Sequence, residues 1–308
     1  MAAVTATRAP FELSTPIVLA SGPAGFGFEL EEALCYESVG ALTTKTVTPR
    51  PRAGNPQPRL VDCAAGLLNS IGLENPGFDR FVSEVLPDLG RLTTRRIVSL
   101  AARQPDELAR MVEMLSAVPT VDALELNLSC PNVDSVVQGS DPMLAAAFVR
   151  EARAATGTTL IVKLPGDAGT ILAVSQAALD AGADGLTLIN SVRGLRIDHR
   201  IGRPMLDRVA GGLSGPAILP IALARVYEVR QAFPRAFIIG TGGVTDLAST
   251  IEMLAAGADA VGIGYGVMAD PSLPTRLADG LDAWLAERGI ASLAEVIGAA
   301  HRGGFLVP

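Results

Sequence analysis

One cysteine between two asparagines is the strongest chemical feature of the sequence. The segment Asn127-Leu128-Ser129-Cys130-Pro131-Asn132 ends an apolar run that is typical of a buried strand. Pro131 has no backbone N–H, so we expect strand pairing to stop there. The Cys130 thiol could act as a base or nucleophile, with the two carboxamides holding a flat polar ligand beside it. The alternative is a buried structural cysteine in a turn that the asparagines shape.

Two lysines interrupt other apolar runs and also need a chemical reason. Lys45 and Lys163 lie inside segments that are otherwise suited to buried strands, where an unpaired ammonium is costly. An anionic ligand or an electron-accepting ring beside each lysine would explain them. The alternative is that each side chain reaches solvent or pairs with a buried carboxylate.

The elements that must position these groups are short aliphatic runs separated by helical patterns. Eight candidate strands are expected at 16–22, 41–47, 96–102, 123–129, 159–165, 185–191, 236–242 and 260–266. A helix is expected between Asp246, a suitable N-cap, and Gly257. The phrases Ala181-Gly182-Ala183-Asp184-Gly185 and Ala256-Gly257-Ala258-Asp259-Ala260 echo each other at the ends of helices that lead into strands.

This alternation predicts an α/β fold, a single (β/α)8 TIM barrel with long insertions after strands 2 and 6. The insertions are 48–94 and 192–235, and long ordered insertions on a barrel usually build or cover its site. No linker divides the chain, so we expect one domain over residues 1–308. The structural alternative is a doubly wound open sheet.

In a barrel the polar residues at the carboxyl ends of the strands meet at one mouth. Here they are mainly amides and lysines, and no His/Asp/Glu metal set or carboxylate pair is visible, so we expect no metal site. The last two strands instead end in glycines, at Gly242-Gly243 and Gly264. Such turns can bind phosphate through backbone N–H groups. Alternatively, they only make tight turns between strand and helix.

Composition narrows the function classes. The hydrophobic fraction is 49%, the charged fraction 19% and the net charge −7, which favours a well-buried globular protein over a nucleic-acid binder. The three cysteines are far apart and have no C-x-x-C spacing, so a disulfide framework or an internal iron–sulfur site is disfavoured. Without a signal peptide pattern or a long apolar run, we expect a cytoplasmic protein.

Several motifs in one order resemble the class 1 dihydroorotate dehydrogenases, flavin enzymes of pyrimidine biosynthesis, and most closely the class 1B catalytic subunits. The resemblance runs from Ala20-Ser21-Gly22 to the eighth strand. The motifs are Thr44–Thr48, Gly54–Arg59, Leu68–Gly77, Asn127–Asn132, Ile189–Ser191, Gly211–Ala217 and Gly242-Gly243.

The resemblance implies FMN as the cofactor. The cofactor-binding positions are Ser21, Lys45, Thr46, Ser99, Asn127, Lys163, Ile189, Gly215, Gly242, Gly243, Gly264 and Tyr265. Lys163 would stabilise the charge that reduction places on the flavin. The chain departs from the family pattern at Ser99, at Leu164-Pro165-Gly166-Asp167 and at Tyr265, which puts local flavin contacts in question more than the reaction.

The resemblance also implies that dihydroorotate is oxidised to orotate. Cys130 would remove a proton from C5 while a hydride passes from C6 to FMN. The substrate-binding positions are Lys45, Asn69, Ser70, Ile71, Gly72, Leu73, Asn127, Asn132, Asn190 and Ser191. The second class of the enzyme uses a serine as base and has a membrane-associating extension; here the base position is a cysteine, and we expect no such extension.

In class 1B enzymes a partner subunit carrying FAD and a [2Fe–2S] cluster passes the electrons to NAD. We therefore expect either a homodimer or a heterotetramer with such a subunit, and no nucleic-acid or membrane partner. Three alternatives stay open: a fumarate-linked class 1A enzyme, another flavin-dependent dihydropyrimidine oxidoreductase, and a catalytically silent flavin-binding subunit.

Overall fold

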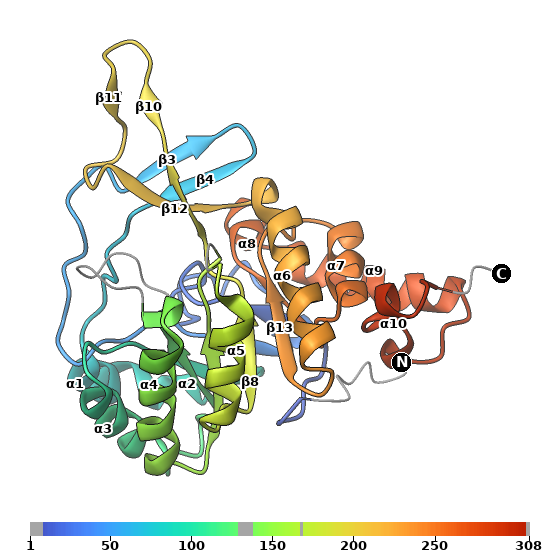
Figure 1. Cartoon of the computed structure of the whole chain (residues 1–308), viewed down its shortest axis with the longest axis horizontal. Coiled ribbons are helices and arrows are strands. Elements are labelled where there is room, and N and C mark those ends of the chain that lie inside the picture. The colour runs from blue at the N-terminus through green and yellow to red at the C-terminus, as the bar shows by residue number, and fades with distance from the viewer. Residues whose placement is uncertain (1–8, 129–137, 167–168, 306–308) are drawn as a thin grey trace.

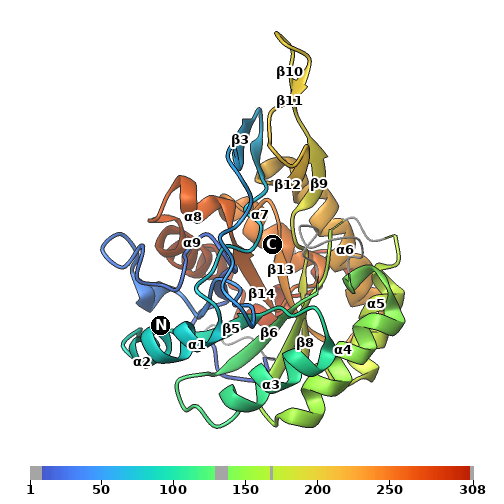
Figure 2. The ribbon, with the colours of Figure 1, turned by 90° about the vertical axis from the view of Figure 1, so that its left-hand side faces the viewer.

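The eight predicted strands form a closed parallel barrel in the computed structural model, which describes residues 9–128, 138–166 and 169–305 (Figures 1 and 2). The neighbouring order around the barrel is β1-β14-β13-β8-β7-β6-β5-β2. The strands are β1 (Ile17–Leu19), β2 (Ala41–Thr43), β5 (Arg95–Leu100), β6 (Ala123–Asn127), β7 (Thr159–Lys163), β8 (Gly185–Leu188), β13 (Phe237–Thr241) and β14 (Ala260–Ile263). The predicted (β/α)8 barrel is confirmed, and the open-sheet alternative is wrong.

Helices pack around the outside of the barrel, as Figure 2 shows most plainly. The longer helices are α3 (Pro105–Leu115), α4 (Pro142–Ala155), α5 (Ile171–Asp180), α6 (Leu219–Ala232), α7 (Leu247–Ala256) and α9 (Leu273–Glu287). Shorter ones are α1 (Phe78–Arg80), α2 (Leu86–Leu89), α8 (Tyr265–Ala269) and α10 (Leu293–Val296), and a π-helical turn at Phe81–Val85 joins α1 to α2. Within the described ranges, no helix is both long enough and apolar enough to cross a membrane.

The residues at the two predicted ends fix where helix α7 begins and stops. The Asp246 carboxylate accepts the backbone N–H of Ser249 at 2.8 Å, which satisfies one of the amides left free at a helix start. Gly257 ends the helix with a φ of +121°, a conformation that disfavours residues with a Cβ. Both predicted ends of this helix are confirmed.

The interior of the barrel changes character along its axis. The amino-terminal half is filled by apolar side chains from successive strands, including Val18, Ile97, Ile161, Phe237 and Ile239. The next inward-facing position on several strands, two residues further along, is polar instead, as at Ser99, Lys163 and Thr241. The polar half lies at the carboxyl ends of the strands, where barrels place their sites.

The two long insertions meet in one antiparallel sheet beyond the barrel mouth (Figure 1). The first insertion contributes β3 (Leu60–Cys63) and β4 (Gly66–Asn69), and the second contributes β9 (Val192–Leu195) and β12 (Ala210–Ser214). Their order is β3-β4-β12-β9. A hairpin of β10 (Ile197–Asp198) and β11 (Arg203–Pro204) projects from the second insertion.

Candidate active site

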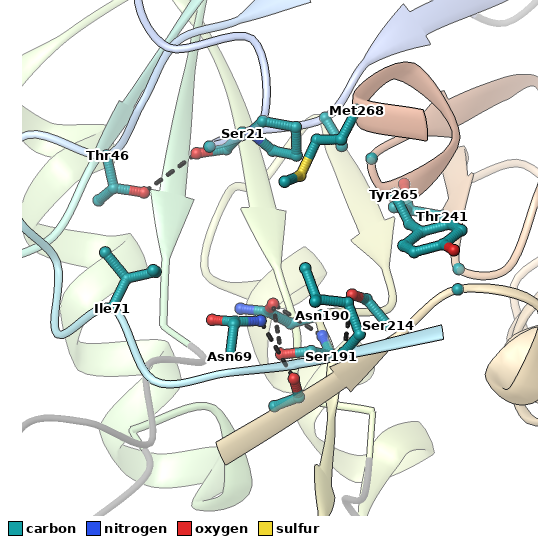
Figure 3. A pocket seen from close by; sticks show the side chains of 18 of the residues that line it. Ser21, Thr46, Asn69, Ile71, Asn190, Ser191, Ser214, Thr241, Tyr265 and Met268 are labelled. Atoms are coloured by element: carbon teal, nitrogen blue, oxygen red, sulfur yellow. Dashed lines mark hydrogen bonds between the residues drawn. The ribbon is translucent and has the colours of Figure 1, made fainter. Parts of the chain in front are cut away.

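A cavity of about 430 Å³ lies between the barrel mouth and the small sheet (Figure 3). Its volume is in the range of small-molecule and cofactor sites. Leu60, Leu67 and Asn69 line it from the first insertion, and Gly212 and Ser214 line it from the second. The insertions therefore wall the cavity, as their length and position predicted.

Most of the predicted site residues are brought together on the wall of this cavity. These are Ser21, Lys45, Thr46, Asn69, Ile71, Gly72, Leu73, Asn127, Lys163, Ile189, Asn190, Ser191, Gly215, Gly242, Gly243, Gly264 and Tyr265. Residues predicted for the cofactor and for the substrate share the same space. One cavity can therefore bring two ligands into contact.

The two lysines give the cavity its positive charge. Lys163 is only 5% exposed, yet its ammonium makes no hydrogen bond or ion pair with another described residue. Burial lowers the pKa of Lys45, although the carboxylates of Glu74 and Glu29 offset part of that shift. Neither lysine forms an ion pair with a carboxylate in the described ranges, which was one of the two alternative explanations for both. The cavity is thus suited to an anionic or electron-rich ligand.

Carboxamides on the cavity wall supply directed hydrogen-bonding groups. The Asn69 amide donates to the carbonyl oxygen of Gly212 at 3.1 Å, and the Asn190 side chain accepts the backbone N–H of Ser191 at 2.8 Å. A Cβ at Gly212 would lie 2.0 Å from the Ser191 hydroxyl oxygen. Only glycine therefore lets β12 pass this close to the polar wall.

The glycine turn after β13 lies on the cavity wall. Gly242 and Gly243 have φ values of +133° and +80°, and a Cβ at Gly243 would lie 2.6 Å from Leu219. The N–H groups of Gly242, Gly243, Gly264 and Tyr265 donate to no acceptor among the described residues. Consecutive unpaired backbone amides form a concave anion-binding surface. This arrangement favours the phosphate interpretation of these glycines over simple tight turns.

Two predicted residues lie behind the wall instead of on it. Ser99 is fully buried, and its hydroxyl contacts Thr46 and Glu125. Ser70 is also buried, where it accepts the Asn55 amide at 3.0 Å. Cys130 and Asn132 lie outside the described residues. The hydrogen bond from Gly139 N–H to the Leu128 carbonyl oxygen, 2.7 Å long, joins the two sides of the segment that contains them, next to Asn127.

Other residues on the wall were not predicted. They include Leu60, Leu67, Glu74, Ser214, Thr241 and Met268. Thr241 immediately precedes the Gly242-Gly243 motif, and its buried hydroxyl oxygen has no hydrogen-bond partner among the described residues. Alternation along β13 was the available signal, since Thr241 faces inward two residues after Ile239. Leu60 and Met268 carry no such signal, because their exposed positions depend on tertiary structure.

The chemistry that this wall supports is the binding of a flat, polar, partly anionic ligand. Amides, hydroxyls and two ammonium groups line an otherwise apolar cavity, and Glu74 is its one carboxylate among the described residues. That carboxylate is already paired with Arg59. No group of three potential metal ligands occurs in the described part of the chain. The expectation of a site without a metal therefore stays a prediction.

Comparisons with known proteins agree on one family. Residues 3–285 match the family model described as dihydroorotate dehydrogenase. A protein of Trichlorobacter lovleyi, named "Dihydroorotate dehydrogenase B (NAD(+)), catalytic subunit", is 43% identical over 290 residues, which cover 94% of this chain and 95% of that protein. A protein of the same name from Pelobacter propionicus is 41% identical over 298 residues, covering 96% and 98% of the two chains.

The fold also has a solved counterpart. The crystal structure of DHODH from Eimeria tenella in complex with ferulenol superimposes with a TM-score of 0.79 and 22% identity, covering 97% of this chain and 89% of that one. At that identity the likeness concerns the fold alone.

Proposed function

The chain belongs to the dihydroorotate dehydrogenase family, and on that premise we propose how its cavity oxidises dihydroorotate to orotate in pyrimidine biosynthesis. The expected resemblance to class 1B catalytic subunits is confirmed by the relatives of that name. The observation that carries the proposal is the convergence of Lys45, Lys163 and the carboxamides of Asn69, Asn127 and Asn190 on one cavity.

Family members depend on a flavin, and we propose that this chain holds FMN. The phosphate would lie against the unpaired N–H groups of Gly242, Gly243, Gly264 and Tyr265. Cβ atoms at Gly242 and Gly243 would clash with Ala222 and Leu219, so the backbone there is bare. The orphaned hydroxyl of Thr241 adds a further polar group beside this turn. The residues present therefore fit a flavin mononucleotide.

Other predicted cofactor positions would hold the ring system. They are Ser21, Lys45, Thr46, Asn127, Lys163, Ile189 and Gly215, which line the same cavity. These residues would hold FMN, which would supply the acceptor for the hydride that leaves C6 of dihydroorotate. The buried Lys163 ammonium has no partner among the described residues. It would therefore stabilise the negative charge that this reduction creates.

The chain's own residues would bind the substrate and remove its proton. Lys45 would hold the carboxylate, while Asn69, Asn127, Asn132, Asn190 and Ser191 match the amide and ureide groups, with Ser70–Leu73 beside them. Cys130 would take the C5 proton onto its thiolate sulfur as the C5–C6 double bond forms. The two electrons of the broken C6–H bond leave with the hydride.

We further propose that electrons leave through a partner subunit. The relatives are named catalytic subunits of an NAD(+)-linked enzyme, and this chain has only three, widely separated cysteines. A [2Fe–2S] cluster needs four protein ligands in most cases. An FAD and iron–sulfur subunit would supply them and pass the electrons to NAD. Copurification of the tagged chain with a brown protein that contains iron would support this arrangement.

Anaerobic titration tests the central reaction. Purified protein should be yellow, release FMN on denaturation, and bleach when dihydroorotate is added without oxygen. Colourless protein that takes up no FMN would contradict the flavin proposal. Yellow protein that other dihydropyrimidines bleach, while dihydroorotate does not, would point to a different substrate.

A further inference from the structure

A buried carboxylate lies in the barrel interior behind the cavity wall. Glu125 on β6 is 2% exposed and does not line the cavity. One of its oxygens accepts the Ser99 hydroxyl at 3.1 Å, and the other accepts the Thr187 hydroxyl at 3.0 Å. No described residue forms an ion pair with it. A buried carboxyl group held by only two hydroxyls is costly, so its presence calls for a reason.

Hydrogen bonds connect this carboxylate to the cavity. The Ser99 hydroxyl lies 2.9 Å from that of Thr46, which lines the cavity. The Thr46 oxygen lies 3.1 Å from the Ser21 hydroxyl and accepts the Asn127 amide at 2.9 Å. Figure 3 shows the bond between Ser21 and Thr46 at the cavity wall. Ser99 thus links Glu125 to these wall residues.

Counting the available protons gives this series of hydrogen bonds a direction. The Ser99 hydroxyl donates its single O–H to the Glu125 carboxyl group. The Ser99 oxygen can then only accept, so the Thr46 hydroxyl donates its own O–H to it. Thr46 is left as an acceptor, so Asn127 must turn its NH2 group toward it. If the hydrogen bonds ran the other way, Ser99 would donate to Thr46 and Thr46 would donate to Asn127. The Asn127 amide would then have to turn its oxygen toward Thr46.

We propose that Glu125 is a positioning residue that orients the Ser21 hydroxyl and the Asn127 amide for the ligand through Ser99 and Thr46. The inference rests on the proposed function, since Ser21, Thr46 and Asn127 are proposed there to hold FMN. A carboxylate suits this role better than an amide because both of its oxygens accept. A glutamine would have to donate to one of the two hydroxyls that Glu125 contacts.

The opposite oxygen of Glu125 supplies a matched control. Thr187 donates to the same carboxyl group, but this bond is not part of the series of hydrogen bonds that reaches the cavity. Thr187→Val is nearly isosteric and removes that one bond, whereas Ser99→Ala removes the link to Thr46. The double variant Glu125→Gln/Thr187→Val removes the carboxylate charge as well as that bond, so Ser99 no longer faces a group that can only accept and the direction of the hydrogen bonds is no longer imposed.

The experiment measures FMN affinity by quenching of FMN fluorescence, and the visible absorption spectrum of the bound flavin. Ser99→Ala and Glu125→Gln/Thr187→Val should each weaken FMN binding about tenfold, the effect of one misdirected hydrogen bond. Both should also shift the absorption bands of the flavin. Thr187→Val should keep the affinity and spectrum of the wild type, although its melting temperature falls as much as that of Ser99→Ala.

Two results would overturn the inference. One is wild-type FMN affinity in Ser99→Ala, which would decide the matter even if the double variant did not fold. The other is an equal loss of affinity in Ser99→Ala and Thr187→Val, which would mean that Glu125 only supports the fold. Wild-type protein that binds no FMN would instead refute the proposed flavin site, so the two failures are distinguishable.

Discussion

The carboxylates of Asp184 and Asp259 make the same contacts in two different parts of the barrel. Asp184 accepts the N–H of Leu160 at 2.8 Å, and Asp259 accepts the N–H of Ile238 at 2.9 Å. Each carboxylate also pairs with an arginine from the helix before the neighbouring strand, Arg153 at 3.0 Å and Arg230 at 2.5 Å. Each aspartate therefore ties the start of its own strand to the preceding strand and helix.

Burial predicts that the two pairs differ in energy. The Asp259 side chain is fully buried, whereas that of Asp184 is 40% exposed. Asp259→Asn should cost about 3–5 kcal/mol because it leaves Arg230 charged and buried, and Asp184→Asn about 1 kcal/mol or less. Urea unfolding measures both. Equal losses would show that burial of the charged pair does not set the cost.

The sequence predicted that these two units repeat, but it did not show which contacts the repeated residues make. The echoed phrases around Gly182 and Gly257 indicated repeated strand–helix units. A Cβ at Gly182 would lie 2.7 Å from the Arg153 stem, and a Cβ at Gly257 would lie 2.4 Å from the Arg230 stem. These arginines lie about thirty residues earlier in the chain, and only the closed barrel brings them over the glycines.

The sequence predicted the residues on the cavity wall, but not the residues in the layer directly beneath it. Strand ends and motifs located the cavity wall, because the carboxyl ends of barrel strands converge. Ser99 was placed on that wall, yet it pairs in register with Glu125, one inward-facing position below Asn127. Depth inside a barrel depends on strand tilt and register, which a single sequence does not reveal. The role of Glu125 was hidden for the same reason.

Tyr36 should make stability depend on pH in the alkaline range. Burial raises the pKa of Tyr36 to about 12, from an ordinary value of 10.0, and its hydroxyl donates to the Gly27 carbonyl oxygen. The stability it contributes is present below pH 10 and is lost as the pH rises through about 12. Tyr36→Phe should be less stable at neutral pH, and the difference from wild type should shrink above pH 10. A constant difference would contradict this.

Lys45 should make orotate binding sensitive to pH. Burial lowers the pKa of Lys45 below its ordinary value of 10.5, with partial compensation from Glu74 and Glu29. Only the ammonium attracts a carboxylate, so affinity should be full below the lowered pKa and fall as the pH rises through it. Titration of the flavin spectrum with orotate would show this fall. Lys45→Arg should bind orotate with the same affinity across this pH range. If Lys45→Gln keeps the pH dependence of the wild type, Lys45 is not the group that causes it.

Lys163 should set how easily the flavin is reduced. Its ammonium has no partner among the described residues, so Lys163→Gln removes charge that is available to the reduced cofactor. The midpoint potential should become more negative by about 30 mV or more, which corresponds to about 1.4 kcal/mol for a two-electron couple. Lys45→Gln removes the other ammonium of the cavity and should weaken orotate binding, with a smaller shift in the flavin potential than Lys163→Gln. A larger shift in potential in Lys45→Gln than in Lys163→Gln would contradict the role given to Lys163.

Cys130 should be needed for proton removal and not for holding the flavin. Cys130→Ala should retain FMN, while its reduction by dihydroorotate at neutral pH slows by about 100-fold to 10,000-fold, the usual contribution of a positioned base. The wild-type rate should rise with pH as the thiolate forms, near pH 8.5 for a free thiol. Cys130→Ser should be slow as well, because a serine hydroxyl is a much weaker acid and its oxyanion is scarce at neutral pH. Stopped-flow absorbance under anaerobic conditions measures each rate, and orotate binding provides the control for an intact site. A Cys130→Ala enzyme that binds orotate and is reduced at the wild-type rate would exclude the thiol as the base.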